Sequence, residues 1–151
     1  MDRLEAFFHT ASAFCIWAEG SPALPDEEAA TAASLLSRLY TQANELPQLF
    51  DEEDAPRPSH QEWLVVYNRF GSLPFNCYAV YSNPHDVEEP TPGTGHLADD
   101  LADIWRDLKS GLVLYEKGDH AAAACEWRDS FNDPWGRHAA AALYALQCWR
   151  S

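Results

Sequence analysis

Apolar residues recur at intervals of three and four along five stretches of the chain, which is the spacing of one face of an α-helix. The pattern predicts helices over residues 2–18, 26–46, 59–71, 96–117 and 119–150. Prolines and glycines separate these stretches, and Pro134 interrupts the last one, where we expect a kink or a division into two helices. We therefore predict an all-α, single-domain helical bundle of five to six helices over residues 1–151.

Residues 73–95 break the helical pattern. The prolines and glycines that prevent a long helix there are Pro74, Pro84, Pro90, Pro92, Gly93 and Gly95. The segment 75–81 fits either extended chain or a single helical turn, and no segment has the period of a strand. We expect a long irregular loop, which in a compact domain is typical of a mobile or binding edge.

The stretch 96–117 carries the most informative pattern. At about 100° per residue, its large apolar side chains fall in one narrow sector that predicts the core-facing side. Asp100, Asp103 and Asp107 stack along one shoulder of this sector, where the buried face meets solvent. Gly111 continues the same line and predicts the close approach of another backbone.

The aspartate shoulder has two interpretations. One is a seam of ion pairs, for which the candidate cations are Arg106, Lys109, Arg128 and Arg137. We expect Arg128 or Arg137 to lie against the aspartates. The other is an acid/base or metal site, in which Asp100, Asp103 and Asp107 hold Mg²⁺ or Mn²⁺ with Glu126 and His138 as further candidates. A lone histidine among alanines, such as His138, also fits a hydrogen-bonded structural residue.

Two motifs carry a family resemblance. They read L-A-D-D-L-A-D-I-W-R-D-L-K at 97–109 and E-W-R-x-S-F-x-x-x-W-G-x-H at 126–138. Together they resemble an uncharacterised bacterial family of domain-of-unknown-function type. The resemblance covers roughly the C-terminal half and implies an all-α bacterial protein. It implies no activity, cofactor or site residue.

Charge and composition exclude several classes of function. The chain has 24 Asp and Glu against 10 Lys and Arg, a formal charge of −14, which repels nucleic-acid phosphates. No apolar run approaches the ~18 residues of a membrane span, and the N-terminus lacks a cationic signal-like region. Four cysteines without a C-x-x-C pair suit free thiols in a reducing compartment. We therefore expect a cytoplasmic protein that binds neither nucleic acid nor membrane.

The residues support three hypotheses of function. The first is a non-enzymatic interaction protein without cofactor, whose acidic surface captures a basic bacterial protein partner as immunity or antitoxin proteins do. The alternative is a divalent-metal-dependent hydrolase that uses the aspartate stripe with Mg²⁺ or Mn²⁺. The third is a structural or regulatory bundle whose long loop is the contact edge. The sequence leaves the partner and the oligomeric state open.

Overall fold

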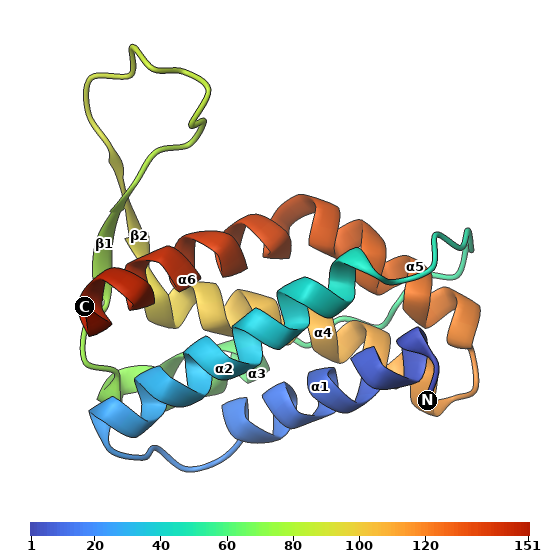
Figure 1. Cartoon of the computed structure of the whole chain (residues 1–151). Coiled ribbons are helices and arrows are strands. Elements are labelled where there is room, and N and C mark those ends of the chain that lie inside the picture. The colour runs from blue at the N-terminus through green and yellow to red at the C-terminus, as the bar shows by residue number, and fades with distance from the viewer.

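Six α-helices and one small β-hairpin make up the fold in the computed structural model, which describes residues 1–151 (Figure 1). The elements are α1 (Arg3–Ala18), α2 (Pro25–Asn44), α3 (His60–Arg69), β1 (Cys77–Val80), β2 (Gly93–His96), α4 (Leu97–Glu116), α5 (His120–Ser130) and α6 (Gly136–Arg150). The prediction of a predominantly helical bundle is confirmed. Each predicted helix end lies within two residues of the observed one.

Helix α4 occupies the middle of the bundle and packs against α1, α3, α5 and α6 (Figure 1). Its predicted apolar sector is buried, with Leu101, Ile104 and Leu108 fully inaccessible to solvent. These residues belong to one contiguous core of 32 buried side chains that draws on every helix. None of the helices has both the length and the apolar content to cross a membrane.

A buried ion pair joins the first three helices at one corner of the bundle. Glu28 of α2 pairs with Arg69 at the end of α3, and both side chains are almost fully buried. Trp17 of α1 completes the group, because its indole Nε1 donates to Glu28 Oε1 at 3.1 Å and its carbonyl accepts from Arg69 Nε at 3.0 Å. These additional hydrogen bonds are what a buried charge pair requires to offset its desolvation.

The expected break at Pro134 divides the last helical stretch as predicted. Asp133 has φ −165° and ψ 112°, the extended conformation that a following proline favours. The wide turn Phe131–Trp135 therefore separates α5 from α6. Phe131 and Trp135 from this turn remain in the core, so the change of direction leaves the aromatic packing continuous.

The sequence predicted that another backbone would approach α4 at Gly111. In the structure a side chain does so instead. The flat indole of Trp127 lies directly on Gly111, where any Cβ would overlap it. Its Nε1 donates to the carbonyl of Leu108 at 3.0 Å, so the ring is held by a hydrogen bond as well as by packing. Glycine at 111 is therefore needed to join α5 to α4.

The region 73–95 departs from the prediction of an irregular loop, because β1 and β2 form an antiparallel hairpin within it. The ring of Tyr78 packs over its cross-strand partner Gly95, where a Cβ would clash with it. The strands have four residues each, and β2 reads Gly-Thr-Gly-His, so no apolar alternation announces them. The remaining loop of residues 81–92 projects away from the helices near the C-terminal end of α6 (Figure 1).

We predict that Gly111→Ala destabilises the protein by about 1–3 kcal/mol, since the added methyl must displace the Trp127 indole. This outcome opposes the usual gain of an alanine in a helix. Chemical denaturation measures the free energy of unfolding. Gly71→Ala is the matched control, because a Cβ at that position meets no atom within 4 Å. Equal stability of the two variants would contradict the assigned packing.

Candidate functional site

The aspartate shoulder of α4 lies largely inside the protein. Asp100 and Asp107 are only 4% and 2% exposed, and the side chain of Asp103 is 20% exposed. A carboxylate removed from water needs hydrogen-bond donors. Each of the three aspartates finds these donors on a different part of the chain.

Asp107 is held by Arg57, a residue of the loop between α2 and α3. Arg57 Nη2 lies 2.5 Å from Asp107 Oδ1, and its Nη1 lies 3.5 Å from Glu126 Oε1 on α5. Burial raises the pKa of Asp107 above its usual range, and the Arg57 guanidinium offsets part of that rise. Burial likewise raises the pKa of Glu126. Arg57 thus fastens the loop to α4 and α5.

The expectation that Arg128 or Arg137 lies against the aspartates is wrong. Arg128 Nη1 donates to the carbonyls of Ala43 and Leu46, each at 3.2 Å, where the end of α2 leaves backbone oxygens without helical partners. Arg137 is exposed and pairs with Asp133 at 3.3 Å. The guanidinium of each arginine therefore contacts a group other than the shoulder aspartates.

Asp103 receives two donors. Trp63 Nε1 of α3 donates to Asp103 Oδ1 at 2.9 Å, and Arg106 Nη2 of the same helix donates to it at 3.2 Å. Arg106 is thus the one arginine among the sequence candidates that pairs with the shoulder. The other cation on α4, Lys109, instead binds Glu19 at the end of α1, at 2.9 Å.

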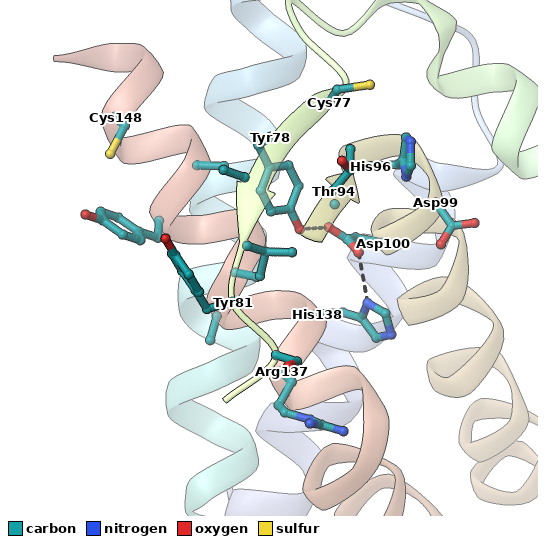
Figure 2. A pocket seen from close by; sticks show the side chains of 18 of the residues that line it. Cys77, Tyr78, Tyr81, Thr94, His96, Asp99, Asp100, Arg137, His138 and Cys148 are labelled. Carbon is teal, nitrogen blue, oxygen red and sulfur yellow. Dashed lines mark hydrogen bonds and ion pairs between the residues drawn. The ribbon is translucent and has the colours of Figure 1, made fainter. Parts of the chain in front are cut away.

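Asp100 joins three elements. The Tyr78 hydroxyl of β1 donates to Asp100 Oδ2, and His138 Nδ1 of α6 lies 2.8 Å from Asp100 Oδ1 (Figure 2). The hydrogen bond to Asp100 raises the pKa of His138, as do the charges of Asp100, Asp103 and Asp99, while burial opposes them. Burial, followed by Asp100, raises the pKa of Tyr78, so its phenol stays a neutral donor. Asp100 thereby attaches the hairpin to the bundle.

A cavity of about 950 Å³ opens where the hairpin stands off from α6. More than half of its 22 lining residues are hydrophobic. Ala140, Ala141, Tyr144 and Ala145 form the wall on α6. The facing wall is the hairpin, and Asp100 and His138 also line the cavity, with Asp100 hydrogen-bonded to both Tyr78 and His138 (Figure 2).

Asp99 also lines this cavity, and unlike the shoulder aspartates it has no hydrogen-bond or ion-pair partner within the chain. Burial raises its pKa, and the nearby charges of Asp103 and Asp100 raise it further. A cation in the cavity would relieve this repulsion. The cavity therefore combines an apolar wall with a carboxylate that has no partner within the chain, and Arg137 and His138 also line it.

The shoulder aspartates do not converge as metal ligands would. Tyr78 and His138 hold Asp100, Trp63 and Arg106 hold Asp103, and Arg57 holds Asp107. No three His, Cys, Asp or Glu side chains are grouped so that they could hold a metal ion. The alternative of a hydrolase that uses Mg²⁺ or Mn²⁺ therefore gains no support from this geometry.

Comparison with protein families assigns the chain to one of them. The family model described as a domain of unknown function, DUF5063, matches residues 1–151. The chain belongs to the DUF5063 family. None of the curated proteins compared with it matches. A crystal structure of protein BF1032 from Bacteroides fragilis has a TM-score of 0.80 and 19% identity, covering 99% of this chain and 93% of that one.

At 19% identity the similarity to BF1032 shows a shared fold alone. The predicted membership of an uncharacterised family is confirmed, and DUF5063 brings no activity with it. The roles of the site residues in this member therefore rest on its own geometry.

Sequence reasoning missed three residues of the site, namely Arg57, Trp63 and Tyr78. Trp63 directly follows the capping box that Ser59 and Glu62 form at the start of α3, and this motif does not indicate which way the indole points. Arg57 lies in a loop whose charge pattern is dominated by the carboxylates of Asp51, Glu52, Glu53 and Asp54, so the pattern did not indicate a cation directed at α4. The one available signal was the phenol of Tyr78 among otherwise apolar neighbours, since a buried phenol needs an acceptor.

We predict that Mg²⁺ and Mn²⁺ leave the thermal midpoint unchanged, because the shoulder carboxylates already have donors. A resident site at 100 times its Kd would add about 2.7 kcal/mol of stability, which is readily detected. Differential scanning fluorimetry measures the midpoint, with NaCl at equal ionic strength as the control. A metal-induced rise that Asp103→Asn abolishes would restore the metal-site interpretation.

We predict that Asp100→Asn lowers the pKa of His138 towards 6.5, because it removes the charge that favours the imidazolium. A raised folded-state pKa means that His138 stabilises the protein fully below about pH 6.5 and loses this contribution as pH rises through the folded pKa. An NMR titration of the imidazole measures both variants. Asp103→Asn is the control with a smaller expected effect, since Asp103 lies 3.9 Å from His138 Nε2.

Proposed function

We propose that this chain is a non-enzymatic binding protein that captures a basic protein partner in the cleft between the hairpin and α6. The observation that carries the proposal is the cavity itself, in which an apolar wall on α6 meets the unpartnered carboxylate of Asp99. Lysine and arginine side chains match such a surface, since they combine an apolar stem with a cationic head. Partner capture of this kind is the action of immunity and antitoxin proteins.

The overall charge supports the same proposal. A formal charge of −14 creates a field that accelerates the encounter with a basic protein and disfavours acidic competitors. Surface charge supplies the rate of association, whereas the apolar cleft supplies the buried contact area that makes a complex last. Binding to this chain therefore combines salt-sensitive association with a dissociation rate set in the cleft.

We predict that Ala140→Arg weakens partner binding at least tenfold, which corresponds to about 1.4 kcal/mol. The new side chain fills the cleft and places a positive charge where the partner brings its own. Ala140 is exposed on α6 and lines the cavity, so the substitution leaves the core untouched. Ala30→Arg is the matched control, because Ala30 is an exposed helical alanine on α2, away from the cleft.

The partner is first obtained by cross-linking to the tagged full chain in a lysate of its host cell, and its complex is then measured with both purified proteins. The supporting result is a basic partner whose affinity falls with added salt, is weakened by Ala140→Arg and is unchanged by Ala30→Arg. An acidic partner, or equal affinity for the two variants, would rule the proposal out.

A further inference from the structure

Strand β1 has one edge paired with β2 and one edge free. The Leu97 N–H donates to the Asn76 carbonyl at 2.9 Å, so residues 76 and 97 are a hydrogen-bonded pair of the antiparallel ladder. Such pairs alternate along the strands, so the next ones are Tyr78 with Gly95 and Val80 with Gly93. The intervening residues Cys77 and Ala79 therefore direct their N–H and C=O groups away from β2.

This free edge faces the cleft. All six residues from 77 to 82 line the cavity, although successive side chains of a strand point to opposite faces. The cavity also touches Thr94, Gly95 and His96 of β2, so these contacts alone do not decide which edge of the hairpin it reaches. Figure 2 points to the edge of β1, because the C-terminal half of α6, which carries Cys148, lies on the side of β1 opposite the strand that carries Thr94 and His96.

We propose that the partner enters the cleft as an extended basic segment that pairs with β1 as a third strand. This inference rests on the proposed function and specifies its binding mode. An exposed strand edge is a template for pairing with another chain, and main-chain hydrogen bonds then supply affinity while side-chain pockets supply specificity. Since β1 has four residues, about four residues of the partner pair with it at about 3.3 Å each.

The surroundings select the chemistry of this segment. Apolar side chains of the added strand contact the α6 wall at Ala141 and Ala145. The loop beyond β1 carries Asp86, Glu88 and Glu89, none of which forms an ion pair within the chain, so basic residues that continue the segment meet carboxylates whose charge no cation of the chain neutralises. A second copy of this chain would bring its own −14 charge to the same edge and be repelled.

Two proline substitutions separate the two edges of the hairpin. Ala79→Pro removes an N–H that points into the cleft, and its cross-strand partner Thr94→Pro removes one that points away from β1. Neither N–H takes part in the hairpin ladder, and proline is tolerated on a strand edge in that situation. Each variant thus removes one N–H outside the ladder, and the two N–H groups belong to opposite edges of the hairpin, although both residues line the cavity.

The probe is a set of ten-residue peptides selected from a displayed random library against the full chain. We expect selected peptides to combine Lys or Arg with apolar residues, to lose at least tenfold in affinity for Ala79→Pro, and to lose distinctly less for Thr94→Pro, whose missing N–H belongs to the other edge of the hairpin. In the wild-type chain, hydrogen exchange at the amides of Cys77 and Ala79 should slow when peptide is added. That readout holds even if Ala79→Pro proves unstable.

Each contrary result overturns the strand-addition mode. These results are equal affinity for the two variants, a bound peptide that is helical by circular dichroism, no enriched peptide, no slowing of exchange at Cys77 and Ala79, or a chain dimer that Ala79→Pro dissociates. The proposed function fails separately. If the purified partner is sensitive to Ala140→Arg but not to Ala79→Pro, capture in the cleft stands and only strand addition is lost.

Discussion

The burial of the aspartate shoulder of α4 is the constraint on which the arrangement of the other elements depends. A carboxylate on the central helix that is withdrawn from water must find donors, and here all of them except Arg106 come from outside the helix. Tyr78 brings the hairpin, His138 brings α6, Trp63 brings α3, and Arg57 brings the loop before it. Each shoulder aspartate thus attaches another element to α4. The attachment is specific because a buried carboxylate without a hydrogen-bond donor would destabilise the folded state.

The same requirement shapes the cleft. Asp100 holds the hairpin by Tyr78 at one end, while the rest of the hairpin extends past the bundle and leaves space beside α6 (Figure 1). The packing of Tyr78 over Gly95 fixes the direction of the phenol, so the position of the cleft wall depends on one glycine and one hydrogen bond. Contacts that hold the wall of a cleft in place reduce the conformational freedom that is lost when a ligand binds.

Much of the fold and part of the site could be predicted from local pattern. Helical periodicity located the helices, and Pro134 located the division of the last stretch. The aspartate shoulder was also found by its angular position. The hairpin was not, because strands of four residues with two glycines in β2 have no periodic signature and are stabilised by what they pack against.

The sequence by itself determined which residues form helices, which side of each helix is buried, and that three aspartates lie at the margin of the core, because these properties follow from spacing within one helix. Only the tertiary structure decided which donors those aspartates receive. Arg57 and His138 lie 50 and 38 residues along the sequence from the carboxylates they contact. Arg128 instead donates to a backbone carbonyl at the C-terminal end of α2. Such pairings depend on the relative positions of packed helices, which no local pattern encodes. The cleft and the free edge of β1 arise in the same way.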